Sequence, residues 1–516
     1  MIDPTRITRG TAPTRGTHTQ WLAAETAGKI IPEGVLCITK DRLYGGSIEY
    51  FMGDGVNGYS KLAKQGEEWI AMSQTVTRSS DYVFTVPGDL TGPLKAGRAL
   101  RFNTSTVVTV VSSSYASDVT TATVYGAALP STLSGWEMAK ADVASAPRNT
   151  AICKEAVEYS SGGRETVMYD DRGLPSVMVR IPAVTYKDVL RKFYADDTAW
   201  NASVFKTVEG ELLPAFKHNG SPIKALWIAK YMASIQQGRA VSLPGVNPSV
   251  GVTYDQARDY CQSKGSGWHL TTGYEWMAVT LVEMAMGTQP SGNTNWGQHH
   301  TNVWESGVRL DGGLPGVTTG DGKTLTGSGG KVWETQSGIA DMVGNCWDWT
   351  HLLKLVDGKV YAPSDNYYDL AEGSWPDTGV RFDSTSGTAD GTGVTADGAP
   401  VISNVITKYT GVPGQTATDY KASGGSFSSI AKKTGYTVPA IAYMLGLCPI
   451  TLDGAAYEAG NPPAGYSYQR NYGERLPIRG GAWYYGASAG LFILYLSLPR
   501  SIVDGNVGFR PAFVEL

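Results

Sequence analysis

The C-terminal segment of this chain constrains its fold most strongly. Residues 491–499 read LFILYLSLP, in which every second position is apolar: Phe492, Leu494, Leu496 and Leu498. A period of two is typical of a β-strand that packs one face against a core. Gly480 and Gly481 allow close approach of the backbone before this strand, and Trp483 and Phe509 supply bulk at the two ends of the segment. We therefore predict a packed strand in a segment whose ends also belong to a core.

Other residues of the same segment have no evident packing role: Tyr484, Tyr485, Ser488, Asp504 and Asn506. Taken by themselves, Tyr484, Tyr485 and Tyr495 are typical of half-buried strand aromatics, and Asp504-Gly505 of a simple turn. Tyr and Trp also suit binding surfaces, because they offer a large contact area at small entropic cost. The residues alone leave both interpretations open.

Composition narrows the fold class and the partners. The 516 residues include 63 glycines, and only 17% are charged against the usual quarter or so, which favours turn-rich β structure. The net charge of −4 supplies no basic field for nucleic acid or anionic membranes. We see no secretion signal and no apolar run long enough to span a membrane, so we expect a soluble protein made in a cytoplasm.

The cysteines and histidines indicate no metal site. Five scattered cysteines occur, never in C-x-x-C spacing: Cys37, Cys153, Cys261, Cys346 and Cys448. We predict buried thiols rather than disulfides or a zinc site. His299 and His300 are adjacent and would point apart on a strand, and no third ligand is evident, so we predict a loop pair.

We predict three regions in a mainly β chain with an α+β C-terminal domain. Residues 1–70 contain short apolar runs separated by Gly-Gly, Gly-Asp-Gly and Asn-Gly turns, which predict a small β module stabilised by packing against copies of itself. Residues 71–180 predict a β-sandwich or barrel and a connection. The N-terminal modules are thus prism-like or sandwich-like. Residues 181–516 form the last domain, with a mostly irregular insertion at about 352–475 and a surface loop at 382–398.

Two helices of the last domain carry capping boxes. Thr253 and Gln256 bracket the start of the first, whose Tyr254, Ala257, Tyr260 and Cys261 share one face. Thr272 and Glu275 bracket the second, and Gly287 is placed to end it.

Three signatures occur in order along the last domain: LWIAKYMAS at 226–234 with GWHLTTGYEW at 267–276, SGIADMVGNCWDW at 337–349, and LPIRGGAW followed by VGFRPAF within 476–513. Together they resemble the C-type-lectin-like fold of the formylglycine-generating-enzyme superfamily. The resemblance spans most of 181–516 apart from the insertion.

Within that superfamily, the final segment is similar to the variable proteins of diversity-generating retroelements, in particular phage tropism determinants. In these proteins a reverse transcriptase misincorporates at template adenines, so chosen codons vary while the fold stays fixed. A gapless alignment over 480–510 implies a variable, ligand-binding set: Ala482, Tyr484, Tyr485, Gly486, Ser488, Tyr495, Ser497, Leu498, Ile502, Asp504, Asn506 and Val507. Val503 and Gly505 are further candidates. All twelve are residue types that adenine randomisation of an Asn codon can produce. Because Leu498 would be exposed, we expect the strand to end near Ser497 or Leu498.

The resemblance implies a receptor-binding protein rather than an enzyme. It implies a homotrimer at the tip of a phage tail fibre, bound to tail components and to a protein or glycan receptor on the host surface, with no nucleic acid and no membrane insertion. A bacterial surface-display variable protein with the same domain is the first alternative. An oxidase of the formylglycine-generating type is the second, although residues 484–492 lack the cysteine pair expected there.

We expect no cofactor. Asp341, Asn345 and Asp348 could hold a structural calcium, but turn contacts and pairing with Arg479 or Arg510 explain them as well.

Overall fold

A computed structural model describes residues 14–16, 36–39, 50–52, 69–91, 94, 99–103, 106–126, 128–139, 154–385, 398–407 and 422–515. The chain divides into two compact units. The first comprises Met1–Tyr159 and Arg172–Leu174, and the second comprises Ser160–Asp171 and Pro175–Leu516. Most of the predicted oligomerisation module lies outside the described residues, so its role stays a prediction.

The N-terminal unit is built from β-strands. A small sheet has the order β1 (Thr14–Gly16), β2 (Leu36–Thr39), β3 (Tyr50–Met52). An antiparallel sheet has the order β4 (Trp69–Ala71), β10 (Trp136–Ala139), β7 (Ala99–Phe102), β8 (Thr106–Ala116), β9 (Val119–Gly126), β6 (Val83–Pro87), β5 (Thr77–Arg78). Its core centres on Phe84, Phe102 and Trp136, which are all buried and in ring contact. The β character predicted for the N-terminal half is confirmed for the described residues, and the described strands of the second module form one sheet rather than the two of a sandwich.

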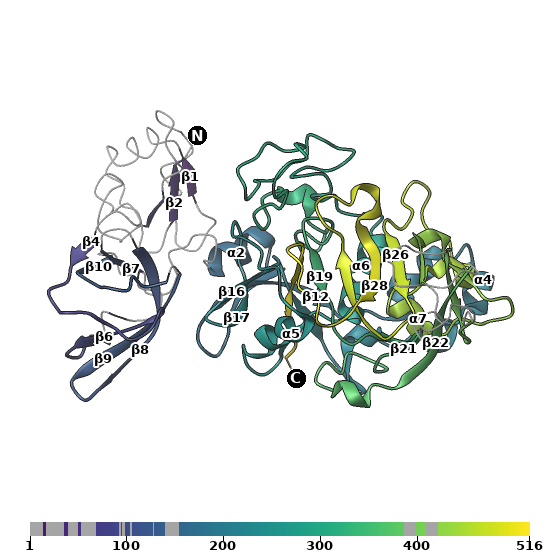
Figure 1. Cartoon of the computed structure of the whole chain (residues 1–516), viewed down its shortest axis with the longest axis horizontal. Helices are drawn as coiled ribbons and strands as arrows, with labels where there is room; N and C mark the ends of the chain where they lie inside the picture. The colour runs from purple at the N-terminus through teal and green to yellow at the C-terminus, as the bar shows by residue number, and fades with distance from the viewer. Residues whose placement is uncertain are drawn as a thin grey trace, which may run out of the picture. The chain divides into compact units, whose positions relative to one another are not determined.

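The C-terminal unit contains two larger sheets (Figure 1). The smaller has the order β11 (Glu165–Tyr169), β12 (Pro175–Pro182), β15 (Ala225–Ala229), β30 (Pro511–Phe513), β18 (Trp268–Leu270). The larger has the order β24 (Ala422–Ser426), β26 (Tyr466–Arg470), β28 (Gly490–Leu498), β27 (Glu474–Gly480), β20 (Lys354–Val356), β21 (Lys359–Tyr361), β22 (Asp377–Ser384), β23 (Pro400–Ser403), β25 (Ala431–Lys432). Beside it, β19 (Trp347–Trp349) pairs with β27 and with β29 (Val507–Phe509). Two ribbons pair β13 (Lys217–His218) with β14 (Ser221–Pro222) and β16 (Ala233–Gln236) with β17 (Arg239–Ser242).

Both predicted capping boxes are present. Thr253 and Gln256 cap α5 (Tyr254–Gln262), and Thr272 and Glu275 cap α6 (Gly273–Ala285), each by reciprocal side-chain to backbone hydrogen bonds. Gly287 follows α6 with φ +77°, a left-handed geometry that suits glycine. The other described α-helices are α2 (Lys154–Ser161), α3 (Tyr186–Leu190), α4 (Asp197–Ala202) and α7 (Ala440–Met444). Short 3₁₀ turns are η4 (Arg191–Phe193), η5 (Lys206–Val208), η6 (Pro214–Phe216), η7 (Gly330–Trp333), η8 (Glu372–Ser374), η10 (Phe427–Ser429), η11 (Ile450–Asp453) and η12 (Gly486–Ser488).

The insertion at 352–475 contributes strands to the larger sheet. We predicted it to be mostly irregular, yet β20 to β26 lie within it, and β20 pairs directly with β27. The surface loop predicted at 382–398 is wrong at its start, because Phe382 is fully buried in β22. Residues 386–397 of that loop lie outside the described residues.

The predicted strand is β28, and it ends at Leu498 as expected. The prediction of one packed face needs correction. Phe492, Leu494 and Leu496 pack into the main hydrophobic cluster, while Ile493 on the opposite face is fully buried in a second cluster. The reason is that β28 lies between β26 and β27, inside a sheet covered on both faces at this point. Among the described residues, no helix combines the length and the apolar character that spanning a membrane requires.

Candidate ligand-binding surface

The predicted variable positions lie on two connections, on the C-terminal half of β28 and at the start of β29. The first connection, 481–489, joins β27 to β28, and the second, 499–506, joins β28 to β29. Both begin and end on packed strands. Gly480 and Gly481 have φ values of +88° and +94°, and a Cβ on Gly481 would lie 2.8 Å from the Cβ of Ala489. The two glycines therefore make the close approach that the sequence predicted.

Backbone hydrogen bonds fix the first connection on neighbouring loops. The N–H of Trp483 donates to the carbonyl of Asn345 (3.0 Å), and the N–H of Gly486 donates to the carbonyl of Thr294 (3.0 Å). The carbonyl of Trp483 accepts from the N–H of Trp296 (2.9 Å). These bonds need no variable side chain, so the backbone can persist while side chains change.

The second connection is fixed in the same way. The carbonyl of Asn506 accepts from the N–H of Trp347 (2.8 Å), and that of Asp504 accepts from the N–H of Gly251 (3.0 Å). Lys323 Nζ donates to the carbonyl of Gly505 (3.1 Å) and lies 4.8 Å from the ring centre of Trp483. Lys323 thus contacts both connections.

A row of aromatic rings extends from the first connection across β19 and β28 to β26. We call it the aromatic row: Tyr484, Tyr485, Trp347, Tyr495 and Tyr468. Successive ring centres are 5.1, 4.9, 5.6 and 5.1 Å apart. At one end, the side-chain amide of Asn506 donates to the hydroxyl of Tyr484 (2.6 Å). The structure therefore brings together residues 22 positions apart in the variable segment.

The predicted positions differ in exposure. Tyr484 is 41% exposed and Val503 is 60% exposed, and Asp504 and Gly505 are also exposed. Most others are half-buried: Tyr485, Gly486, Ser488, Tyr495, Ser497, Leu498, Ile502 and Asn506. Ala482 and Val507 are buried in the second cluster, so we remove their side chains from the contact set. Ala482 lies two residues after β27, and Val507 is the first residue of β29.

The phenols of the aromatic row are neutral donors. Burial raises the pKa of Tyr484, Tyr485 and Tyr495. Each therefore keeps its proton at neutral pH and can donate or accept one hydrogen bond. The surface offers rings for contact area and small polar groups for hydrogen bonds, which is the chemistry of a binding site.

Two tyrosine substitutions separate buried from surface positions. Ala482→Tyr places a large ring in a packed site and should lower the free energy of unfolding by about 1–3 kcal/mol. Ser497→Tyr, at the half-buried end of β28, should change it by no more than about 0.5 kcal/mol. Urea denaturation of both proteins measures the difference, and equal effects would show that Ala482 reaches the surface.

A protein-family model matches a large part of this chain. The sulfatase-modifying factor enzyme 1-like domain (FGE-sulfatase) matches residues 125–386, just over half of the chain. This chain therefore belongs to the FGE-sulfatase family. The predicted superfamily and its C-type-lectin-like domain are confirmed. The first two signatures lie inside the match, and the one within 476–513 lies beyond it.

Solved structures of variable proteins also match. The Major Tropism Determinant I1 variant is 12% identical with a TM-score of 0.25, covering 98% of this chain and 100% of that chain. The Treponema denticola variable protein 1 is 12% identical with a TM-score of 0.27, covering 68% of this chain and 99% of that chain. At these identities and TM-scores the likenesses carry no argument about function. No curated protein sequence matches significantly.

The FGE-sulfatase family includes enzymes, so it matters whether any described thiol of this chain could act as a nucleophile. Cys261, Cys346 and Cys448 are free and buried, and burial raises the pKa of each thiol. Cys37 and Cys153 have no described side chains. A buried thiol with a raised pKa is a poor nucleophile.

Alkylation tests this conclusion. At pH 8, iodoacetamide should label Cys261, Cys346 and Cys448 more than about 10-fold more slowly in the native protein than in denaturant. Mass spectrometry of the peptides gives each rate. Fast native labelling of Cys346 would instead indicate a reactive thiol in the family fold.

Protein contacts engage one oxygen of each possible calcium ligand, while Asp341 Oδ1 and Asp348 Oδ1 are buried without a hydrogen-bond partner among the described residues. Asn345 Oδ1 accepts from the N–H of Thr324 (2.8 Å), and Asp341 Oδ2 accepts from the N–H of Gly327 (2.7 Å). Asp348 contacts Arg510 at 3.3 Å, while Arg479 donates to the carbonyl of Leu445 (2.5 Å). In the described part of the chain, no group of three or more His, Cys, Asp or Glu side chains is placed to hold a metal.

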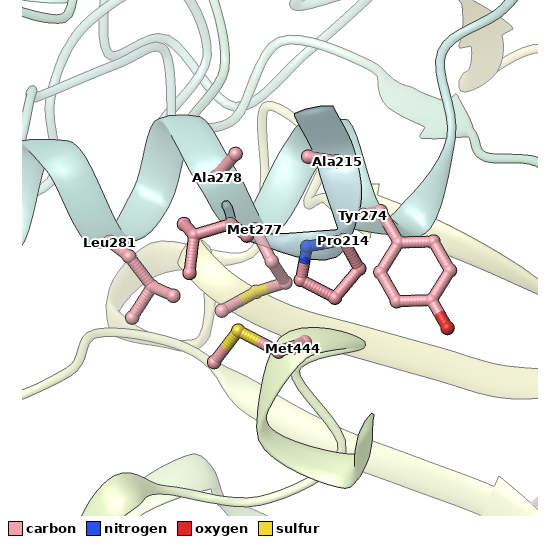
Figure 2. Close-up of a pocket in the computed structure, with 8 residues that line it drawn as sticks. Pro214, Ala215, Tyr274, Met277, Ala278, Leu281 and Met444 are labelled. Atoms are coloured by element: carbon pink, nitrogen blue, oxygen red, sulfur yellow. The ribbon is translucent and has the colours of Figure 1, made fainter. Parts of the chain in front are cut away.

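One apolar gap in the C-terminal unit is too small to hold a ligand. Figure 2 shows Met277 and Leu281 of α6 facing Met444 of α7, with Pro214 and Tyr274 alongside. The residues leave no room for a water molecule. We interpret it as core packing.

Sequence reasoning missed the partners of the variable segment. Trp347 and Tyr468 complete the aromatic row, and Trp296 lies 6.0 Å from Tyr484 between ring centres. Trp347 lies within the predicted SGIADMVGNCWDW signature, whose tryptophans could have signalled the site. Tyr468 lies near the end of the predicted insertion and had no such signal.

Proposed function

We propose that this chain is a receptor-binding protein whose C-terminal domain displays a retroelement-diversified surface. The observation that carries the proposal is the aromatic row together with Asn506, which brings predicted variable positions from both connections into contact. The backbone hydrogen bonds that hold the two connections do not involve the variable side chains. Ten of the twelve predicted positions retain some exposure once buried Ala482 and Val507 are removed. Such a surface can change its ligand without changing its fold.

Cell binding tests the proposal. We expect the full chain to bind at least one cell type in a panel of bacteria from its source. A Tyr484→Ala, Tyr495→Ala, Asn506→Ala triple variant should bind at least about 10-fold more weakly, because central interface aromatics each contribute about 1–2 kcal/mol or more. Ala431→Ser, on exposed β25, is the control. Unchanged binding by a folded triple variant would contradict the proposal.

Binding rather than catalysis is part of the proposal. The absent cysteine pair in residues 484–492 and the burial of Cys346 support it. Oxygen-dependent turnover of a cysteine-containing peptide by the full chain would favour the oxidase alternative instead.

We also propose a homotrimer mounted on a phage tail fibre, without a required cofactor. Several copies of a weak site on one fibre raise the apparent affinity by about 10² to 10⁴ where geometry permits, which would let weak variants function. Light scattering should give three times the 55.1 kDa chain mass. A monomer would contradict the assembly. Recovery on the bacterial surface rather than in virions would favour the surface-display alternative.

A further inference from the structure

A cavity of about 220 Å³ lies beside the first connection of the variable segment. Ala487 of η12 lines it, between the predicted variable positions Gly486 and Ser488. Ala464 and Ala487 are exposed at its rim, while Val343 and Leu491 are buried. The cavity is therefore open to solvent at residues adjoining the aromatic row. It is smaller than the 300–1,000 Å³ or so of pockets for drug-sized ligands, so it suits a single small unit.

Two imidazole rings line this cavity with a defined hydrogen-bonding arrangement. His299 Nδ1 accepts the backbone N–H of Asn302 (2.9 Å). The hydroxyl of Thr294 accepts the backbone N–H of His300 (3.0 Å), so its own proton can be donated to His300 Nδ1 (2.9 Å). In the neutral state, both rings then carry their proton on Nε2. Within the described ranges, no residue hydrogen-bonds to either Nε2 atom.

The lining favours an uncharged ligand. Burial lowers the pKa of both His299 and His300, so both rings are neutral at pH 7. None of the described residues that line the cavity is an aspartate, glutamate, lysine or arginine. The polar atoms of Gln289 are already used, because its amide donates to the carbonyl of Pro462 (2.8 Å) and accepts from the N–H of Ala464 (3.0 Å). The remaining lining is largely apolar, which suits the C–H face of a ring.

We propose that this cavity binds one neutral monosaccharide unit, whose hydroxyl oxygens accept hydrogen bonds from the Nε2 atoms of His299 and His300. The other polar wall groups bond to the protein, so a ligand must bring its own acceptors. A sugar ring presents several hydroxyls together with an apolar face, whereas a tyrosine side chain of a protein receptor presents one oxygen. This inference rests on the proposed function. The cavity is then an invariant subsite for a receptor glycan, and the aromatic row adds variable contacts beside it.

Free sugars test this site directly on the full chain. Saturation-transfer NMR with a panel of neutral methyl glycosides and N-acetylhexosamines should show binding with a Kd of about 1–10 mM, as expected of a single subsite. Ala487→Phe narrows the mouth and His300→Phe removes one donor, and each should weaken binding at least 10-fold. Ala431→Phe, on exposed β25 outside the cavity lining, should bind as the unchanged protein does.

Four results would overturn the inference: no binding by any neutral sugar, binding that persists in both cavity variants, binding of glucuronate alone, or preference for N-acetyltyrosine amide over the sugars. Native folding of each variant is verified by its urea denaturation midpoint. The test uses one fixed sequence, so it is independent of whether the gene varies. Conversely, loss of cell binding in the aromatic-row variant can occur whether or not free sugars bind.

Discussion

Replacing Arg510 with methionine is expected to lower the free energy of unfolding of the C-terminal unit by about 3–5 kcal/mol. The guanidinium is fully buried and donates to four backbone carbonyls, including those of Ala229 (2.9 Å) and Ala340 (3.0 Å), as well as to Asp348. Methionine fills similar space but donates no hydrogen bond, so these acceptors and the Asp348 carboxylate lose their partner. Urea denaturation of the full chain measures the loss.

Arg381→Met is the matched control for Arg510→Met. Arg381 pairs with Asp377 four residues away in a partly exposed salt bridge, so its loss should cost no more than about 1 kcal/mol. Adding Asp348→Asn to Arg510→Met should recover about 1–2 kcal/mol, because it removes an unpaired buried charge. Equal costs for the two arginines would contradict the assignment of Arg510 as the centre of this network.

Acidification is expected to destabilise the C-terminal unit through His351. The ring is buried, accepts from the hydroxyl of Tyr254 at Nδ1 (2.5 Å) and donates from Nε2 to the carbonyl of Tyr368 (3.1 Å). Burial lowers its pKa to about 3 from an ordinary value near 6.5. Because the folded pKa lies below the unfolded one, this stabilisation is complete above about pH 6.5 and is lost as the pH falls towards 3.

Comparing the unchanged protein with His351→Gln isolates this titration. Between pH 7.5 and pH 4, the unchanged protein should lose about 3 kcal/mol more stability than the variant. Burial raises the pKa of Asp341 and Asp348 to about 6, so these carboxyls favour the folded state as the pH falls. Both proteins carry them, and their contribution therefore cancels. Parallel stability curves for the two proteins would show that His351 is not the titrating group.

Local patterns predicted individual elements well. The Thr253 and Thr272 capping boxes depend on residues three positions apart, and both occur at the predicted helix starts. The end of β28 at Leu498 was also predicted, but from the family resemblance rather than from a local pattern. Burial on both faces of β28 was not, because it depends on β26 and β27 and on residues from distant segments.

The arrangement of the candidate site could not be predicted from the sequence, for the same reason. A gapless alignment could place Tyr484 and Asn506 in one segment, but their hydrogen bond depends on how β27, β28 and β29 return to one place. The burial of Ala482 and Val507 follows from packing around Trp347, which the alignment does not contain. The cavity with His299 and His300 combines four separate segments and gave no local signal.

Deep sequencing of the end of this gene across a population of its source tests the central claim most directly. The account predicts substitutions concentrated at adenine-templated codons, including those of Tyr484, Tyr495, Asp504 and Asn506, with a near-identical template repeat and a reverse transcriptase gene nearby. Codons for the packed residues, such as Phe509 and Arg510, should stay constant. An invariant segment with no template repeat would contradict the account and leave the aromatic row as a fixed surface.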